Sequence, residues 1–361
     1  MRGRGAVLVL AVVSCVAGLA LGAEPATPAP TRGAGPAQPA PPGAPESRLS
    51  VVVVTDEAGL GDQGFNDVAW EGVLRAEREL GIHKDIVQSR SQSEYLGNLN
   101  YAAGRAKVVV SVGFLIADAV GRVAPAHPDT YFVHIEGDIA GPNVLCFDFR
   151  SEQAGFLAGC VAALFTKSGQ VGVVAGREIP PVKAYLNGFA AGVATVRATF
   201  GKEVTAHVLY AGTFNDPVKG KSLGEALLAK NCDVIFKAAG NTGVGVLELA
   251  RERPDLHIVA EDLDIDGRLP GRILASTRKC IDVAVFTALK EIAEGRFQPG
   301  HRVLGMKEGG IGLSEMKFTR QLFTEEQLSF LERVKQALRD GRLSVPASDE
   351  ELQAFKAPVL R

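Results

Sequence analysis

The sequence of 361 residues has little of several features that mark common protein classes. Its formal net charge is only −2 and its basic residues form no stripe, so no surface for nucleic acid or acidic lipid is expected. The six histidines are isolated and nowhere spaced as ligands, so no metal is expected. The sequence also lacks the G-x-S-x-G and H-E-x-x-H motifs. We therefore predict no catalytic residue, no cofactor and no enzymatic activity.

Long apolar runs are absent except at the amino terminus. Arg2 and Arg4 precede an apolar run that ends in small residues near position 22, which is the pattern of an export signal. Two processing routes fit this segment: cleavage after Gly22 or Ala23, or lipidation of Cys15 in an imperfect lipobox. No other stretch reaches the ~18 apolar residues of a membrane span. We expect an exported protein, periplasmic or attached to the cell membrane by a lipid anchor.

Residues 23–48 are rich in Pro, Ala and Gly and offer almost nothing to bury. This composition predicts a disordered or polyproline-like linker behind the signal segment 1–22. The remaining chain is long enough for two domains of ordinary size. It gives no sign of an obligate oligomer, so a monomer is expected.

Cysteine is scarce, and no two cysteines form a C-x-x-C pair. Four remain beyond the signal segment, each in an apolar neighbourhood, which favours buried free thiols. An exported compartment permits disulfides, so a bridge between Cys146 and Cys160 stays open as an alternative. The four are Cys146, Cys160, Cys232 and Cys280.

What the chain does contain is a regular alternation of strands and helices. Short β-branched runs alternate with helical patterns at a spacing of 20–30 residues, which is typical of α/β proteins with mainly parallel sheets. The pattern restarts near residue 150 and so predicts two similar lobes. Strands are expected at 51–55, 107–112, 130–135, 144–147, 170–175, 203–210, 233–238, 257–260 and 272–275, and helices from 65 and at 93–103, 115–124, 151–167, 181–199, 217–230, 244–253, 279–294 and 324–340.

The loop after the first strand carries three carboxylates, on Asp56, Glu57 and Asp62, and no Lys or Arg. Ligands of open α/β sheets bind at the carboxyl ends of the strands, where this loop lies. Its glycines resemble those of phosphate-binding turns, but the carboxylates would repel a phosphate. Carboxylates, the amide of Asn66 and the ring of Phe65 suit a neutral, flat, hydroxylated molecule. The simpler interpretation is that Asp62 caps the next helix and Phe65 packs against the core.

The second lobe has comparable loops at its predicted strand ends. Phe214 lies between glycine and polar residues, as Phe65 does, and two such rings from opposite lobes could sandwich a flat ring. Asp262 follows a strand and Lys279 is expected at the start of a helix, where it could pair with carboxylates of a shared cleft. The run from Gly240 to Gly245 is most simply a tight turn, and its glycine spacing does not fit a dinucleotide motif.

Together these strings resemble the basic membrane protein family, the purine-nucleoside-type substrate-binding lipoproteins of ABC importers. The first loop is similar to the family opening D-x-G-x-x-D-x-S-F-N-x-x-A-W-E-G, and the resemblance covers roughly residues 50–315. The residues that carry it are Asp56, Gly61 to Asn66, Ala69 to Gly72, Gly113, Phe114, Asp118, Glu152 to Gly159, Asn187 to Phe189, Gly192, Val193, Gly212 to Asp216, Lys219 to Lys221, Ala239 to Gly245 and Lys279.

The resemblance implies a type I periplasmic-binding-protein fold. In this fold two Rossmann-like lobes with parallel sheets surround a hinged ligand cleft, and three segments cross between them. The expected limits are 49–148 plus about 262–297 for lobe one, and 149–261 plus about 298–361 for lobe two. The implied function is to bind a nucleoside, with a purine base, and to deliver it to an ABC transporter permease.

The family's ligand contacts can be carried onto this sequence one residue at a time. The resemblance assigns the two sides of the base to Phe65 and Phe214 and the base edge to Asn66 and Asp118. It assigns the ribose to Asp56, Asp262 and Lys279, and Gly240 is also expected at the ligand. The chain departs from the family pattern at Gly64, where Ser is usual, and at Glu261, which adds a charge that most members lack.

These departures keep other ligands open, because some relatives bind other flat molecules such as flavins. Two alternatives of a different class also remain. A nucleoside-hydrolysing enzyme could use Asp56, Asp62 and Asp118 as acid and base. A ligand sensor could pass its signal to a membrane receptor instead of a permease.

Overall fold

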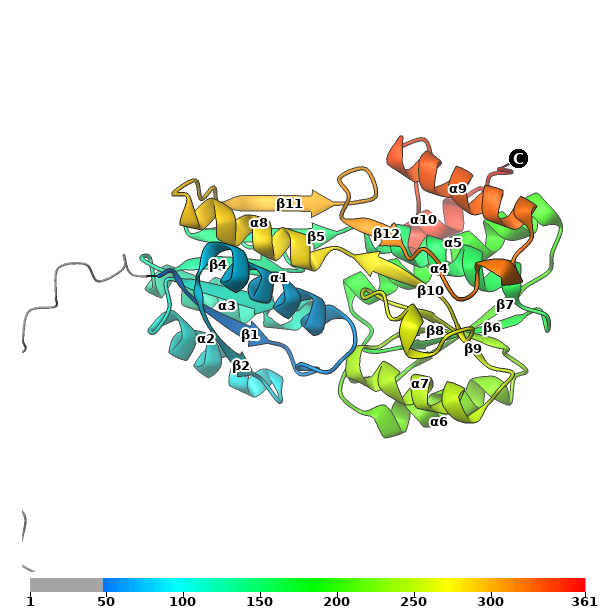
Figure 1. Ribbon diagram of the computed structural model, residues 1–361, viewed down its shortest axis with the longest axis horizontal. Helices are drawn as coiled ribbons and strands as arrows, with labels where there is room; N and C mark the ends of the chain where they lie inside the picture. Colours follow the sequence, from blue (N-terminus) through cyan, green and yellow to red (C-terminus); the bar gives the residue numbers. More distant parts are fainter. Residues whose placement is uncertain (1–47, 361) are drawn as a thin grey trace, which may run out of the picture. The chain divides into compact units, whose positions relative to one another are not determined.

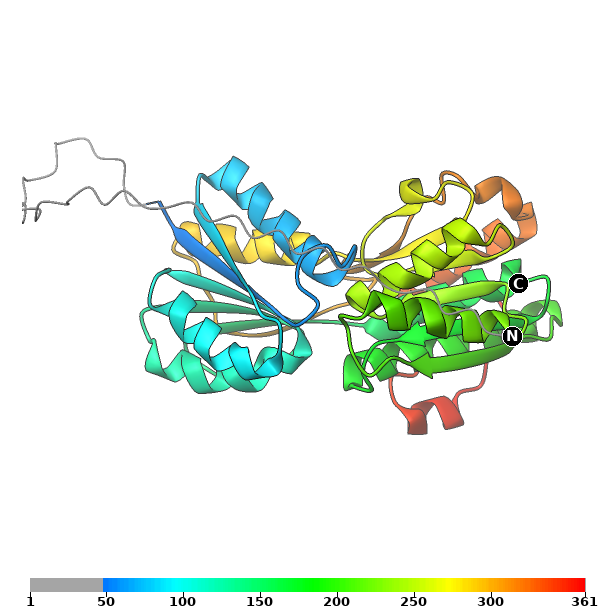
Figure 2. The ribbon, with the colours of Figure 1, turned by 90° about the horizontal axis from the view of Figure 1, so that it is seen from below.

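The computed structural model describes residues 48–360, in which strands and helices alternate and form two sheets (Figures 1 and 2). The expected signal segment with Cys15, and the expected linker apart from Arg48, lie outside the described residues. The predicted α/β class is confirmed.

The first sheet holds six strands in the order β11-β5-β4-β3-β1-β2, and every neighbouring pair is parallel. The run of four valines in β1 is explained by burial on both faces: Val51 and Val53 lie in one core cluster, and Val52 and Val54 in the other. The strands are β1 (Ser50–Thr55), β2 (His83–Gln88), β3 (Val108–Val112), β4 (Tyr131–Ile135), β5 (Val144–Phe149) and β11 (Gly300–Leu304). Helices α1 (Phe65–Leu80) and α8 (Ile281–Ala293) pack together on one face, and α2 (Tyr95–Ala103) and α3 (Ala117–Val123) on the other.

The second sheet has the order β12-β10-β9-β8-β6-β7 and is parallel except for β12, which pairs antiparallel with β10. Helices α4 and α5 cover one face, and α6 and α7 the other (Figure 1). The strands are β6 (Gln170–Ala175), β7 (Thr205–Tyr210), β8 (Val234–Ala238), β9 (His257–Ala260), β10 (Ile273–Lys279) and β12 (Ile311–Leu313). The helices are α4 (Ser151–Phe165), α5 (Pro180–Phe200), α6 (Pro217–Leu228) and α7 (Val244–Glu252).

Helices α4 and α5 cross at very short range, which explains the glycines and alanines in their sequences. A Cβ atom at Gly155 would lie 2.0 Å from the carbonyl oxygen of Tyr185, and one at Gly188 would lie 1.9 Å from that of Glu152. Larger residues there would push the two helices apart.

The carboxyl-terminal region packs on this helix pair. Helix α9 (Glu325–Arg339) contacts α4, and α10 (Asp349–Ala354) contacts α5. Thr324 caps α9 in a capping box with Gln327. Short 3₁₀ helices include η2 (Phe114–Ile116) and η4 (Gly240–Gly243).

The chain passes between the two sheets three times within the described residues, near 150, 280 and 305. This pairing differs from the limits expected from the sequence. The sequence places the segment 262–297 in lobe one, but its strand β10 pairs with β9 in the second sheet. Strand β11, from the segment 298–361, pairs with β5 in the first sheet. From here on, lobe one is the part built on the first sheet and lobe two the part built on the second. The predicted helix from Lys279 was also wrong at its start. Lys279 pairs with Ile311 as the last residue of β10.

The four cysteines beyond the signal segment are free thiols, and three of them are buried in the core. Their free state agrees with the first of the two alternatives above, rather than with a Cys146–Cys160 bridge. Between residues 48 and 360 no helix is both long and apolar enough to cross a bilayer.

Candidate functional site

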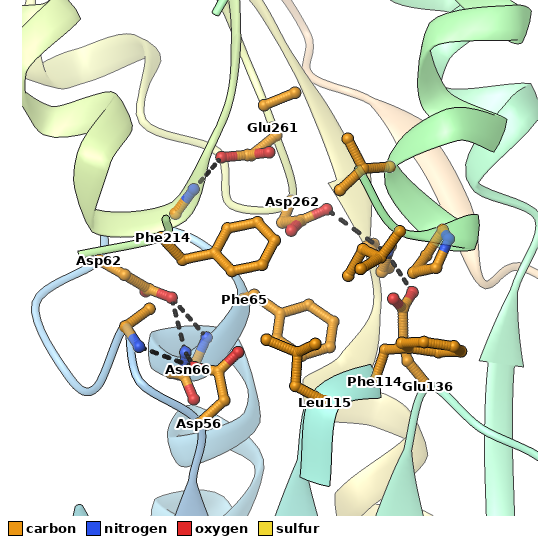
Figure 3. A pocket seen from close by; sticks show the side chains of 18 of the residues that line it. Asp56, Asp62, Phe65, Asn66, Phe114, Leu115, Glu136, Phe214, Glu261 and Asp262 are labelled. Atoms are coloured by element: carbon orange, nitrogen blue, oxygen red, sulfur yellow. Dashed lines mark hydrogen bonds and ion pairs between the residues drawn. The ribbon is translucent and has the colours of Figure 1, made fainter. Parts of the chain in front are cut away.

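Both lobes line one pocket at the carboxyl ends of the parallel strands (Figure 3). The free cavity between the lobes is about 70 Å³, which is less than small-molecule sites usually offer, so the lobes must move apart to admit a ligand. Lobe one contributes Asp56, Ala58, Asp62, Phe65, Asn66, Gly113, Phe114, Leu115 and Glu136. Lobe two contributes Ile179, Pro181, Val182, Tyr185, Phe214, Ala238, Gly240, Glu261, Asp262 and Lys279.

The structure brings together seven of the eight residues that the sequence predicted at the ligand. These are Asp56, Phe65, Asn66, Phe214, Gly240, Asp262 and Lys279. The eighth, Asp118, lies exposed on α3 and does not line the pocket.

The two aromatic rings come from opposite sides of the pocket. Phe65 opens α1 in lobe one, Phe214 follows β7 in lobe two, and both point into the middle of the space (Figure 3). Both are half-buried, and Phe65 also packs against the core. Gly176 makes room for the second ring, because a Cβ atom there would lie 2.1 Å from Cε1 of Phe214.

Two carboxylates of lobe one share the amide of Asn66. Its Nδ2 donates to Oδ1 of Asp56 at 2.9 Å and to Oδ2 of Asp62 at 3.0 Å. Asp62 also accepts from the backbone N–H groups of Gly64, Asn66 and Asp67, so it does cap the first turn of α1. Burial raises the pKa of Asp56 to about 7 and that of Asp62 to about 6.

This arrangement fixes the orientation of the Asn66 side chain. With both amide hydrogens donated to carboxylates, its Oδ1 has no hydrogen-bond partner within the described residues, although the residue is only 1 % exposed. Buried acceptors are normally satisfied, so this oxygen is a place for a ligand N–H or O–H.

The wall of lobe two is organised around Lys279. Its Nζ lies 2.5 Å from Oε1 of Glu136 and 4.0 Å from Oδ1 of Asp262, and it also sits 5.2 Å from the ring centroid of Phe65. The hydroxyl of Tyr185 donates to Asp262 at 2.5 Å. Burial alone would lower the pKa of Lys279, but the carboxylates of Glu136 and Asp262 outweigh it and raise that pKa.

The two carboxylates beside Lys279 have left-handed backbones, with φ of 70° at Glu136 and 65° at Asp262. This conformation is costly for residues other than glycine and concentrates at functional sites. His134 supports the first of them, because its Nε2 donates to the carbonyl oxygen of Glu136 at 3.1 Å. Glu136 and Asp262 thus each place a carboxylate beside Lys279.

Glu261 forms a second charged pair in lobe two. Its Oε1 accepts from the backbone N–H groups of Ala239 and Gly240, both at 3.0 Å, and lies 3.5 Å from Nζ of Lys237. Burial raises the pKa of Glu261 to about 7, although Lys237 opposes this shift.

Comparison with known proteins identifies the family to which this pocket belongs. The family described as ABC transporter substrate-binding protein PnrA-like matches residues 49–348. The chain belongs to this family. The ABC transporter nucleoside-binding protein BmpA of Lactococcus lactis subsp. cremoris is 27 % identical over 328 residues, covering 84 % of this chain and 91 % of the relative. Basic membrane protein D of Borreliella burgdorferi is 28 % identical over 309 residues, covering 83 % and 89 %.

A solved structure supports the same assignment. A solute-binding protein of an ABC transporter system from Aeropyrum pernix K1 superimposes with a TM-score of 0.79 at 28 % identity, covering 85 % of this chain and 96 % of the other. The type I periplasmic-binding fold implied by the resemblance is therefore confirmed, and the chain is a solute-binding protein of an ABC transporter.

In a substrate-binding protein, contacts between the lobes bear on closure around the ligand. Glu57 follows β1 in lobe one, and its carboxylate receives a bidentate pair of hydrogen bonds from Arg177 after β6, at 2.8 and 2.9 Å. It also accepts the backbone N–H of Phe214 at 3.3 Å. Together with the pair of Glu136 and Lys279, this contact holds the two sides of the pocket together.

The sequence interpretation missed four residues that shape this site. Glu136 directly follows β4 and Arg177 comes two residues after β6, so their place near strand ends could have identified both. Tyr185 on α5 and Lys237 inside β8 carry no such signal, because their direction depends on how the lobes and helices pack.

Proposed function

We propose that this protein binds a nucleoside with a purine base between its lobes and delivers it to an ABC permease. The observation that carries the proposal is the pair of rings, Phe65 and Phe214, which face one pocket from opposite lobes. Base stacking on aromatic side chains is favourable by about 1–3 kcal/mol per base. A flat ring between these two side chains would also link the lobes in the closed state.

The polar groups around the rings fit the rest of a nucleoside. The unpaired Oδ1 of Asn66 would accept an N–H from the base edge. Carboxylates and an ammonium group, supplied by Asp56, Asp262 and Lys279, would bind the ribose hydroxyls. The exposed position of Asp118 does not support its assignment to the base edge.

The relatives support the nucleoside as ligand and an extracytoplasmic location. One relative carries the name of a nucleoside-binding protein, and an uncharacterized protein of Pyrococcus furiosus, 30 % identical, is named a lipoprotein. We propose that this chain is likewise exported and held at the membrane through Cys15, and that it acts as a monomer.

A receptor without catalysis fits the acids of lobe one better than an enzyme does. A general acid and a general base need separate access to the reacting bond. Here Asp56 and Asp62 share the amide of Asn66, and Asp62 is fully buried while it accepts hydrogen bonds from α1.

The test is calorimetric titration of the mature domain, residues 49–361, with adenosine, guanosine, inosine, uridine and riboflavin, followed by product analysis. One-to-one binding of a purine nucleoside without product is expected. Binding of riboflavin alone would replace the ligand and keep the family function. Release of free base would show a hydrolase.

A further inference from the structure

Three hydrogen-bond donors converge on a single oxygen of Glu261, a residue that lines the pocket, and two of these donors lie behind the pocket wall. The backbone N–H groups of Ala239 and Gly240 and the ammonium group of Lys237 surround Oε1 of Glu261, at 3.0, 3.0 and 3.5 Å. Two adjacent strands build this arrangement, because β8 ends just before Ala239 and β9 just before Glu261. We name these three donors the β8 nest.

The ammonium group of the nest is held in place by burial. Lys237 is fully buried, and its Nζ makes no hydrogen bond to any of residues 48–360. Its aliphatic stem runs beneath the turn of η4, since a Cβ atom at Gly243 would lie 3.2 Å from Cδ of Lys237. A buried ammonium group without a counter-charge is strongly unfavourable, so this position requires an anion.

Glu261 supplies that anion from within the chain. Its carboxylate lines the pocket, and its Oε2 accepts no hydrogen bond from the described residues. It also borders lobe one, because its Cγ lies 3.9 Å from where a Cβ atom of Gly64 would be. Paired backbone amides next to an ammonium group are a general means of binding phosphate or carboxylate.

We propose that Glu261 determines specificity by occupying the β8 nest, so that no phosphate or carboxylate group of a ligand can bind there. The pocket then accepts uncharged ligands such as nucleosides and rejects their phosphate esters. This reading rests on the proposed function for the choice of nucleoside, but occupation of the nest can be tested without any nucleoside. It also implies that a phosphate-ester hydrolysis must precede capture when the available source is a nucleotide.

The first experiment replaces the internal carboxylate by a free one. The variant Glu261→Ala should bind formate, which has the carboxylate and little else. Its Tm should rise by roughly 3 °C between 0 and 100 mM sodium formate, with sodium chloride keeping the ionic strength constant. The wild type and Glu225→Ala, which removes an exposed carboxylate on α6, should show no rise specific to formate.

The second experiment measures selectivity by titration with inosine and inosine 5′-monophosphate. The wild type should bind the nucleoside and discriminate against the monophosphate. Glu261→Gln retains the shape of the side chain and removes its charge, so the ratio of the two affinities should fall by about tenfold. Glu261→Ala should lower the ratio further.

The outcomes separate this proposal from the proposed function. A formate response in Glu261→Ala alone supports the nest even if no nucleoside binds to the wild type. A folded Glu261→Ala without a formate response overturns the proposal, and so does unchanged discrimination in Glu261→Gln. If Glu261→Ala does not fold in chloride, refolding in formate supports the nest, and failure in both salts together with unchanged selectivity of Glu261→Gln overturns it.

Discussion

The carboxylates that line the pocket differ in how their charges are compensated: Glu136, Glu261 and Asp262 lie near a lysine, whereas Asp56 and Asp62 do not within residues 48–360. In lobe one, Asp56 and Asp62 share one amide and form no ion pair within the described residues. In lobe two, Glu261 is paired with Lys237 and Asp262 lies 4.0 Å from Lys279. Burial raises the pKa of Asp56 to about 7 and that of Asp62 to about 6 with no cation of the described chain to oppose it, and it raises the pKa of Glu261 to about 7 although Lys237 opposes this shift.

This difference assigns separate tasks to the two walls. The charges of lobe two are compensated within the protein, by Lys237 and Lys279. The wall of lobe one is left with unfavourable buried carboxylates that hydroxyl donors of a ligand would stabilise. Binding sites commonly sacrifice stability in this way.

Removing the lysine that compensates the charge of Glu261 in lobe two should have the largest effect on stability. Lys237→Met leaves the Glu261 carboxylate buried without a counter-charge and should lower the free energy of unfolding by about 3 kcal/mol. Urea unfolding at pH 8 measures this. The double variant Lys237→Met/Glu261→Gln should recover most of the loss. A single variant as stable as the wild type would show that the pair does not compensate charge.

Removing a buried charge from lobe one should stabilise the protein, whereas Lys237→Met should destabilise it. Asp56→Asn should raise the free energy of unfolding of the ligand-free protein by roughly 2 kcal/mol at pH 8 and weaken ligand binding. The folded state holds the Asp56 proton more tightly, because the pKa rises from 3.8 to about 7. The contribution of this bound proton to the free energy of unfolding is thus greatest below pH 4 and is lost as the pH rises to about 7.

The pH dependence supplies the control for this prediction. Between pH 4 and 7 the decline in stability should be smaller in Asp56→Asn than in the wild type, whereas Asp129→Asn, an exposed acid, should follow the wild type. Equal pH profiles for all three proteins would contradict a raised pKa at Asp56.

Replacing the aromatic residues of the two walls should affect stability differently as well. Phe214→Ala should weaken ligand binding by about 1–3 kcal/mol, with a small effect on stability. Phe65→Ala should weaken binding similarly and also lower stability, because Phe65 packs against the core. Titration and thermal unfolding measure the two effects, and Tyr101→Ala, an exposed ring on α2, serves as control. Unchanged affinity in Phe214→Ala would remove the stacking role.

Weakening the Arg177–Glu57 contact between the two lobes should have the smallest effect on ligand affinity. Arg177→Lys cannot keep the bidentate geometry with Glu57 and should weaken ligand binding by about 1 kcal/mol, or about fivefold. Small-angle scattering of the ligand-free protein should show a larger radius of gyration. Arg197→Lys, whose partner Glu203 is exposed, is the control. A radius equal to that of the wild type would show that this contact does not hold the lobes.

Most of the fold could be predicted from the sequence because buried parallel strands are continuous apolar runs. The four valines of β1 and the run at 107–112 needed no tertiary information. Strand β11 was missed because its residues are mostly exposed at the sheet edge, as His301 and Val303 show. The end of β10 was misplaced because its last residue, Lys279, is fixed by pairing with β12, which is distant in sequence.

The site was predictable where function resides in loops at strand ends. Asp56, Phe214 and Asp262 follow strands, and parallel strands bring those ends together. Asp118 was expected at the ligand from the family pattern, yet its place on α3 turns it to the surface. Which carboxylates acquire a counter-charge depends on packing, so the contrast between the two walls could not be predicted.

The nearly complete burial of two polar pocket residues, Asn66 and Lys279, has a kinetic consequence. Asn66 and Lys279 are only 1 % and 2 % exposed, so a ligand cannot reach them while the lobes stay in this arrangement. Capture therefore depends on the fraction of time that the molecule spends open, and the apparent affinity for an entering ligand scales with that fraction. A residue that does not line the pocket, such as Arg177, can then change both the rate of capture and the duration of retention through the equilibrium between open and closed states.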